Sequence, residues 1–534
     1  MRYFALILCV LGLVGGVVAV SLAPHWWSLW IALGVFAALC ATGAHDLLQS
    51  RHAILRNYPV IGHLRFLLEF IRPELRQYFI EADTEALPFS RAQRALVYQR
   101  AKGEPDGRPF GTLKEVGQTG YEWINHSMRP SRAEGHEFRV VIGSQRAQPY
   151  SASVFNISAM SFGALSANAI MALNRGAKLG GFMHDTGEGS ISQYHRVHGG
   201  DLVWQVASGY FGCRNEDGSF SEERFAVNAR DPQVKLIEIK LSQGAKPGHG
   251  GVLPGPKVTA EIAAARGVPQ GVECVSPAAH SAFSTPLELM RFVVRLRELS
   301  GDKPVGFKFC LGHPWEWFAI VKAMLHTGVT PDFIVVDGAE GGTGAAPVEF
   351  SDHVGTPLRE GLSLVHNTLV GVGLRDRIRL GAAGKVVSAF DIARLMALGA
   401  DWCNAARGFM MALGCLQART CHTGNCPTGV TTQDPLRQKA LVVTDKAERV
   451  MHFHRSTLHA LQELVQAAGL HHPNEIGTHH IVRRISATEV RPLSSLVLQL
   501  PPGALLGPLD TLPDIFRRHW PAANPASFER GAGA

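Results

Sequence analysis

Between residues 150 and 410, short β-rich runs alternate with helix-compatible segments, and this alternation restricts the fold more than any other feature of the chain. We expect eight strands: Ser153–Ala159, Gly181–Asp185, Leu236–Leu241, Gly271–Val275, Pro304–Cys310, Asp332–Asp337, Arg377–Gly381 and Asp401–Ala405. Apolar strands that alternate with helices favour a parallel sheet covered by helices. Eight of them in about 260 residues fit an α/β fold, the (β/α)8 TIM barrel. An open doubly wound sheet is the alternative, because periodicity does not show that a sheet closes.

Glycine and polar residues are concentrated directly after the expected strands, where barrel enzymes build their active sites. The turns Gly381–Lys385 and Ala406–Gly408 follow the last two strands. Glycines leave backbone N–H groups free to bind an anion, and barrels often hold a phosphate at this position. We therefore expect a phosphate site there, with ordinary tight turns as the alternative. Residues 341–344, Gly-Gly-Thr-Gly, match neither the dinucleotide fingerprint nor the ATP-binding loop, whose glycine spacings differ.

The N-terminal segment is a separate unit, because no Asp, Glu, Lys or Arg occurs from Phe4 to Ala44. Its two apolar runs, Phe4–Leu22 and Trp27–Ala44, each approach the ~20 residues that a membrane-spanning helix needs. Arginines such as Arg2 and Arg51 flank the pair, which favours a cytoplasmic location for both ends. We expect a transmembrane hairpin in the cell inner membrane, with the catalytic domain in the cytoplasm. A signal peptide followed by a lone anchor is the alternative.

Two regions outside the hairpin and the barrel, residues 46–150 and 436–534, carry no visible chemistry. We expect a hairpin over residues 1–45, a partly helical connecting region over 46–150, a barrel over 151–435, and a C-terminal extension over 436–534. In the connecting region, Pro73 is expected to break a helical pattern. In the extension, Gln438–Ala468 is typical of one amphipathic helix, and the tail from about residue 500 has too little periodicity to predict order.

The charge of the chain excludes one class of partner. A formal net charge of +7 arises from 52 basic and 45 acidic residues without a long Lys/Arg run. Nucleic acid is therefore not expected to bind.

Cys415, Cys421 and Cys426 are the strongest local signal. Three thiolates suit an iron–sulfur cluster with three iron corners, whereas a [4Fe–4S] cluster normally requires four. A zinc site completed by His422 and a set of unligated cysteines are the alternatives left open by the spacing.

The cysteine segment at 415–435 resembles the [3Fe–4S] segment of glutamate synthases. Further stretches resemble the same family in the same order: Thr186–Gly189, Val206–Gly212, Gln243–Gly255 and Gly341–Pro347. The resemblance covers about 150–440 and implies an FMN-binding (β/α)8 barrel with a [3Fe–4S] cluster on Cys415, Cys421 and Cys426. In that family, reduced FMN passes a hydride to 2-iminoglutarate, which forms from 2-oxoglutarate and ammonia, and the product is L-glutamate.

The resemblance also implies roles for single residues. The 2-oxoglutarate site would consist of Met160, Glu188, Gln243, Lys246 and Arg266, with Glu188 and Lys246 as the catalytic residues. Lys246 and Arg266 suit a dicarboxylate, and Glu188 suits proton transfer as ammonia condenses. FMN would be bound by Ala159, Ser161, Gln205, Lys308, Gly341, Gly342, Gly384 and Arg407. Lys308 would face the flavin N1–O2 region, and a structural ion pair with Asp337 is the alternative.

Some features depart from the family. Tyr210 stands where we expect Arg, and His249 replaces an expected acidic residue. Neither a glutaminase nor an NAD(P)H fingerprint is visible, so we expect a separate ammonia source and an electron-donor protein or a membrane electron pool. Two other functions remain open. One is an FMN/Fe–S oxidoreductase for another 2-oxo acid or an N-substituted glutamate, and the other is a non-catalytic electron-transfer subunit of a membrane complex.

Overall fold

The computed structural model describes residues 2–83, 85, 88–344 and 346–531. The chain separates into two compact units, Met1–Glu85 and Ala86–Ala534. Ala345, within the Gly341–Pro347 stretch, lies outside the described residues.

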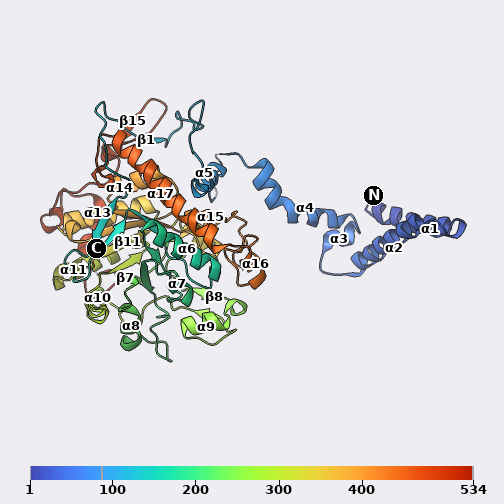
Figure 1. Cartoon of the computed structure of the whole chain (residues 1–534), viewed down its shortest axis with the longest axis horizontal. Coiled ribbons are helices and arrows are strands. Elements are labelled where there is room, and N and C mark those ends of the chain that lie inside the picture. The colour runs from blue at the N-terminus through green and yellow to red at the C-terminus, as the bar shows by residue number, and fades with distance from the viewer. Residues whose placement is uncertain (1, 84, 86–87, 345, 532–534) are drawn as a thin grey trace. The chain divides into compact units, whose positions relative to one another are not determined.

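The first unit consists of helices (Figure 1). They are α1 (Phe4–Leu22), α2 (Trp27–Leu48), α3 (Ala53–Asn57), α4 (Gly62–Leu75) and the π-helical turn η1 (Arg76–Ile80). α1 and α2 pack closely: a Cβ added to Gly12 would lie 2.4 Å from the Phe36 ring, and one on Gly16 would lie 3.2 Å from Leu33. Small residues let two helix backbones approach in this way. Both helices are long and apolar enough to cross a membrane.

The expectation that Pro73 breaks a helix is wrong. α4 continues through Pro73 to Leu75 and passes directly into the π-helical turn. Proline removes one backbone donor, and a local change of hydrogen-bond spacing is a common way for a helix to continue.

The second unit is built around a closed barrel of eight parallel strands, which confirms the predicted fold class. In barrel order the strands are β4 (Phe155–Ile157), β5 (His184–Asp185), β6 (Leu202–Val206), β7 (Val234–Lys240), β10 (Val305–Phe309), β11 (Phe333–Asp337), β12 (Arg379–Ala383) and β13 (Trp402–Ala405). The barrel closes where β13 pairs with β4, for example Cys403 with Phe155. The open-sheet alternative is therefore excluded.

One predicted barrel strand is wrong. Gly271–Val275 contains β9 (Cys274–Val275), which pairs antiparallel with β8 (Val252–Leu253) outside the barrel. The strand that was missed is β6, all of whose residues are buried. Only a four-residue helix, α7 (Gln193–Arg196), lies between β5 and β6, so the alternation of strand and long helix is interrupted there.

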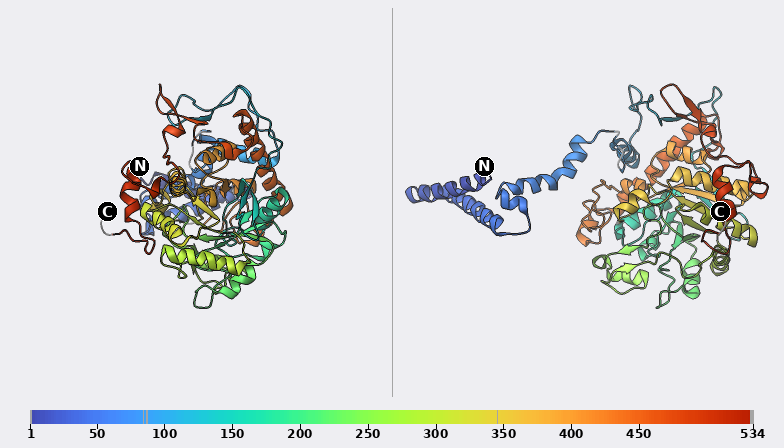
Figure 2. Two further views of the ribbon diagram at one scale, coloured as in Figure 1. Left: turned by 90° about the vertical axis from the view of Figure 1, so that its left-hand side faces the viewer. Right: turned by 180° about the vertical axis from the view of Figure 1, so that it is seen from behind.

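Helices surround the barrel strands (Figure 2). Those within the barrel region are α6 (Ala167–Gly180), α8 (Glu222–Ala229), α9 (Ala260–Arg266), α10 (Pro286–Ser300), α11 (Pro314–Thr327), α12 (Val348–His353), α13 (Leu358–Gly371), α14 (Ala389–Ala397) and α15 (Arg407–Ala412). Short 3-10 turns are η2 (Gly255–Lys257) and η3 (Arg375–Arg377). Residues 241–285, which contain η2, β8, α9 and β9, form a long excursion after β7 that we call the β7 excursion.

Residues 88–150 and the C-terminal extension pack on the barrel. They contribute α5 (Arg91–Lys102), α16 (Pro435–Lys439), α17 (Val443–Ala467), α18 (Asp514–Ala522), the strands β1 (Glu122–Ile124), β2 (Arg139–Ile142), β3 (Tyr150–Ser153), β14 (Ile481–Arg484) and β15 (Val490–Pro492), and the turns η4 (Pro473–Glu475), η5 (Leu493–Ser495) and η6 (Ala504–Leu506). α17 approaches α6 so closely that a Cβ on Gly176 would lie 2.5 Å from Val450.

The expectation of little order in the tail is also wrong. α18 lies in the tail, and Phe516 stacks on Phe318 of α11 with ring centroids 5.4 Å apart. Trp520 meets the same ring edge-on at 5.5 Å. The apolar side of α18 therefore closes the barrel surface over α11.

Candidate active site

A pocket opens at the carboxyl ends of the barrel strands. Its walls come from the segments after β4, β7, β11, β12 and β13, and from the segment before α5. The lining residues are Phe89, Ser158, Ala159, Gln243, Ala245, Lys308, Asp337, Gly341, Gly342, Ala383, Gly384, Lys385, Val386, Asn404, Ala406, Arg407 and Gly408. Of the eight residues expected to bind FMN, the structure brings six to this pocket; Ser161 and Gln205 lie elsewhere.

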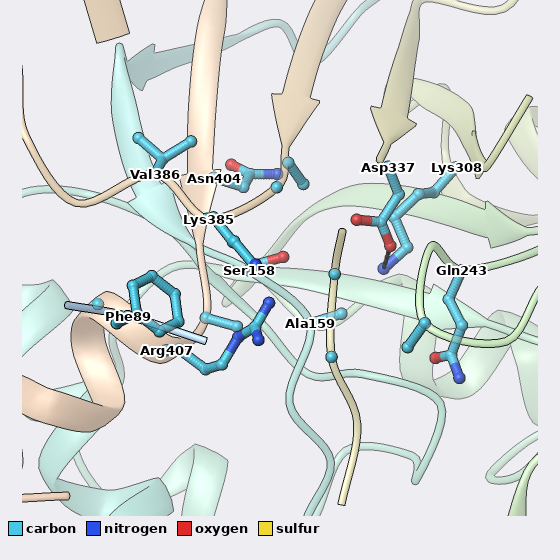
Figure 3. A pocket seen from close by; sticks show the side chains of 17 residues that line it. Phe89, Ser158, Ala159, Gln243, Lys308, Asp337, Lys385, Val386, Asn404 and Arg407 are labelled. Carbon is cyan, nitrogen blue, oxygen red and sulfur yellow. Dashed lines mark ion pairs between the residues drawn. The ribbon is translucent and has the colours of Figure 1, made fainter. Parts of the chain in front are cut away.

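One side of the pocket carries the cations of the predicted phosphate site (Figure 3). Burial lowers the pKa of Arg407, whose guanidinium lies 5.0 Å from the Phe89 ring centroid and donates to the carbonyl of Glu340. Burial and the nearby Arg407 also lower the pKa of Lys385. Lys385 has φ 51°, a left-handed conformation that is costly for a residue with a side chain. Two partly desolvated cations on the turns after β12 and β13 favour an anion between them.

The other side of the pocket carries Lys308 on β10, which is buried. Its ammonium lies 4.0 Å from a carboxylate oxygen of Asp337 and 4.0 Å from one of Glu238. Burial opposes the charge of Lys308, but Glu238, Asp337 and Asp185 outweigh it and raise the pKa of the ammonium. The structural pair with Asp337 and a position at the pocket therefore coexist.

Behind Lys308, two buried carboxyls face each other. Asp185 of β5 and Glu238 of β7 are hydrogen-bonded to one another, and burial raises the pKa of both. Gln205 donates to Glu238 over 2.6 Å, which places it beneath the pocket instead of on its wall. Two carboxylates in contact cannot both ionise without a large cost, so the pair holds a proton near neutral pH.

A second cluster lies around Glu188, which follows β5. Its carboxylate pairs with the Lys240 ammonium at 2.9 Å. Burial would raise the pKa of Glu188, but Lys240, Arg266 and Lys246 together hold it below the usual value. Burial lowers the pKa of Lys246, and Lys240 lowers it further. Sequence reasoning missed Lys240. The spacing of Glu238 and Lys240 was its signal, because residues two apart on a strand face the same side.

Arg266, at the end of α9, reaches this cluster. Its guanidinium donates to the carbonyl of Phe162 over 3.3 Å and lies 5.1 Å from the Phe211 ring centroid. A Cβ on Gly163 or Gly189 would lie 3.3 or 3.2 Å from a guanidinium nitrogen, so two chain segments leave room for it. Among the described residues, the buried Nε of Arg266 has no hydrogen-bond partner.

The other residues expected at the substrate site are distributed differently. Gln243 lines the pocket. Met160 is buried, and its backbone nitrogen lies 3.1 Å from the position that a Cβ on Gly187 would take. The Ser161 nitrogen lies 2.7 Å from the same position. Met160 and Ser161 therefore support the Gly187 turn that precedes Glu188.

Two loops at the barrel mouth touch through their backbones. A Cβ on Gly244, after β7, would lie 1.7 Å from the carbonyl oxygen of Gly338, after β11. The Gly244 nitrogen also donates to the Asp337 carboxylate over 3.1 Å. This contact fixes the loop with Gln243 against the loop with Gly341.

The cysteine segment lies beside the pocket loops, since a Cβ on Gly344 would be 3.9 Å from that of Cys421. Burial would raise the pKa of Cys426, but hydrogen bonds from Thr431 and Thr428 lower it to about 7. Burial raises the pKa of Cys415 to about 11, and the charges of Cys421 and Cys426 contribute. Within the described ranges, no three His, Cys, Asp or Glu side chains are grouped as a single-ion site.

The model for the conserved region in glutamate synthase matches residues 127–471 of this chain, which is more than half of its length. The chain belongs to the glutamate synthase family. The expected family is thereby confirmed, and so is an oxidoreductase of glutamate synthase type at the level of the family.

Two relatives show how the family match is distributed. The glutamate synthase large subunit-like protein YerD of Bacillus subtilis is 38% identical over 496 residues, which cover 85% of this chain and 94% of the relative. An archaeal glutamate synthase [NADPH] of Methanocaldococcus jannaschii is 38% identical over 315 residues, which cover 59% of this chain and 58% of the relative. A solved mutant flavocytochrome b2 with pyruvate bound is similar at a TM-score of 0.41 and 13% identity, over 90% of this chain and 98% of that one.

The two departures from the glutamate synthase pattern lie in different surroundings. Tyr210 is buried, and its hydroxyl bonds the ring of His280 over 3.1 Å; the other ring nitrogen of His280 donates to the Lys240 carbonyl over 2.8 Å. Burial lowers the pKa of His280 to about 4, so the ring is neutral and relays this contact. Tyr210 thus positions the strand end that carries Lys240. His249 is exposed and packs on Phe350.

Proposed function

We propose that this chain is an FMN-dependent enzyme that aminates 2-oxoglutarate reductively to L-glutamate, with electrons entering through a [3Fe–4S] cluster. The observation that carries the proposal is the pairing of a glycine-lined pocket next to Lys308 with the cluster of Glu188, Lys240, Lys246 and Arg266.

The pocket fits FMN. A Cβ on Gly342 would lie 2.6 Å from the Arg407 guanidinium, so glycine lets that cation approach the loop backbone. Arg407 and Lys385 would hold the phosphate, and Lys308 would face the ring system. When bound, FMN would supply the hydride chemistry.

The cluster fits a dicarboxylate. With Lys240, Lys246 and Arg266 protonated and Glu188 ionised, its net charge is +2, which a 2-oxo dicarboxylate would balance. Arg266 would bind one carboxylate with two parallel donors. The neighbouring cations keep Glu188 ionised, which is the form that can accept a proton, and they make it a weaker base than a free carboxylate. Glu188 would take up a proton as ammonia adds to the ketone.

The cysteine segment fits an iron–sulfur cluster in its donor set. Cys415, Cys421 and Cys426 are neighbours, and hydrogen bonds favour the thiolate of Cys426. Three thiolates match the three iron corners of a [3Fe–4S] cluster. Its position next to Gly344 would bring electrons to the pocket loops.

The hairpin would anchor the protein in a membrane. Only 11% and 6% of the apolar windows of α1 and α2 are buried, whereas a core helix of a soluble protein would be mostly buried. Both ends are expected in the cytoplasm because Arg51, Arg56 and Arg65 follow α2. The electron source would be a donor protein or a membrane pool, and the ammonia source a separate protein or free ammonia.

The first experiment is cofactor analysis of detergent-purified full-length protein, by visible spectrum, flavin release and iron content. FMN and about three irons per chain are expected. L-glutamate is then measured after chemical reduction with 2-oxoglutarate and ammonia. The Lys246→Ala variant should lose product formation, whereas Lys114→Ala, at an exposed position, should retain it. Loaded protein that makes no glutamate but aminates another 2-oxo acid would move the proposal to that substrate. Loaded protein active on none would favour electron transfer alone.

A further inference from the structure

α4 carries an apolar stripe that the described residues of the first unit leave largely exposed. Leu64, Leu67, Leu68, Ile71 and Leu75 recur at the spacing of one helix face. Four of these five side chains are exposed, from 39% for Leu75 to 55% for Leu67, and Ile71 is partly buried. The stripe continues into η1, where Phe79 is 83% exposed.

One flank of the leucine stripe on α4 is charged. Arg65, Glu69 and Arg72 follow one another at helical spacing, and Arg65 pairs with Glu69 at 2.9 Å. Arg76 extends this row into η1. A helix with a long apolar stripe and a charged row beside it is suited to the boundary between acyl chains and lipid headgroups.

A buried elbow connects this helix to the hairpin. Asp46, in the last turn of α2, is fully buried and accepts hydrogen bonds from the Val60 nitrogen at 2.9 Å and from the His63 ring at 2.9 Å. Val60 has φ 67°, a conformation that is rare and costly for a β-branched residue. The Asp46 contacts hold this strained turn, so the start of α4 is fixed to the end of α2.

We propose that α4 and η1 form a second membrane contact, which lies in the interface of a lipid bilayer with the leucine stripe toward the acyl chains and the arginines toward the headgroups. The partner is the lipid surface itself, because the elbow keeps the stripe next to a helix pair that is apolar enough to span it. This inference rests on the proposed insertion of the hairpin.

Photo-cross-linking of the full-length protein in vesicles of phosphatidylethanolamine and phosphatidylglycerol tests it. A photoreactive phenylalanine analogue replaces Leu68 on the stripe, Glu69 on the charged row, or Val14 on α1 as the hairpin control. Lipid adducts at positions 14 and 68 but not at 69 are expected. Asp46→Ala should abolish the adduct at 68 and leave that at 14 unchanged.

Other adducts would overturn the inference. If position 68 cross-links to a second copy or to residues of the second unit while position 14 labels lipid, the stripe is a protein contact. If position 14 does not cross-link to lipid, the hairpin is not inserted in the bilayer. The proposals of a membrane anchor and of an interfacial helix are then both wrong. L-glutamate formation is measured in a separate experiment, so the enzymatic proposal is judged independently of both cross-linking results.

Discussion

The Lys257 ammonium donates a hydrogen bond of 2.7 Å to the backbone carbonyl oxygen of Cys421. Lys257 belongs to η2 of the β7 excursion, which also carries Lys246 and Arg266. The segment that would bind the substrate is therefore tied directly to the segment that would bind the cluster.

Replacement of Lys257 by Met should loosen the cysteine segment. A hydrogen bond from a charged donor contributes about 1.5–3 kcal/mol, and its loss should increase hydrogen exchange over residues 415–426. Iron should also leave more easily on chelator treatment. Lys257→Arg keeps a cationic donor and should restore both measurements. Unchanged exchange in Lys257→Met would show that the contact contributes nothing to the order of this segment.

Removal of Lys240 should be more damaging than removal of both members of its ion pair. Lys240→Met leaves the Glu188 carboxylate, which is 19% exposed, without its 2.9 Å partner. The cost should stay below the ~3–5 kcal/mol of fully buried pairs, because Lys246 and Arg266 still face the carboxylate. We expect a lower midpoint in chemical denaturation and at least about tenfold weaker 2-oxoglutarate binding, or ~1.4 kcal/mol. In Lys240→Met/Glu188→Gln, most of the stability should return while binding stays weak. Equal losses in the single and double variants would contradict this coupling.

Glu238 should make the folded state less stable as pH rises. Burial and the contact with Asp185 raise the pKa of Glu238 from 4.5 to about 8, so the folded state holds a proton that the unfolded state has released. This contribution is complete below pH 4.5 and is lost as the pH rises toward 8. Glu238→Gln keeps an acceptor for Gln205 and should flatten the decline, measured by denaturation between pH 5 and 8 at about unit intervals. A slope identical to that of the wild type would show that Glu238 does not hold the proton.

His184 should produce the opposite dependence at acidic pH. Burial lowers its pKa from 6.5 to about 3, and neither ring nitrogen has a hydrogen-bond partner among the described residues. The unfolded state binds a proton below pH 6.5 that the folded state refuses until about pH 3, so stability falls as the pH falls through this window. His184→Met should remove up to about 1.4 kcal/mol of this loss per pH unit. Thermal unfolding of both proteins at pH 7 and at about pH 5 measures it, and parallel losses would disprove it.

The sequence predicts the barrel because seven of its strands are apolar runs that alternate with helical segments. β6 was not predicted because the helix before it, α7, is only four residues long. Gly271–Val275 was assigned to the barrel because it contains a strand, β9, but β9 lies outside the barrel. α18 was not predicted because Pro521 and the surrounding prolines and glycines make the helical spacing of Phe516 and Trp520 hard to recognise.

The positions of site residues in glycine-rich motifs could be predicted from the sequence. The positions of residues on barrel strands could not, because they depend on strand register. Lys308, Gly342, Gly384 and Arg407 meet at one pocket as their motifs imply. Gln205 was expected on the wall but bonds Glu238 beneath it, because strand register decides which inward residues lie at the rim. Register between β6 and β7 is set by tertiary pairing, which one sequence does not display.

The backbone contact between Gly244 and Gly338 limits how this barrel could be redesigned. Barrel enzymes are commonly altered by grafting a new loop onto one strand end while the scaffold is left intact. Here the loops after β7 and β11 occupy a single shared space, with no side chain between them to absorb a change of length. A new loop grafted after either strand would require a matching change in the other loop. The two loops therefore have to be redesigned together.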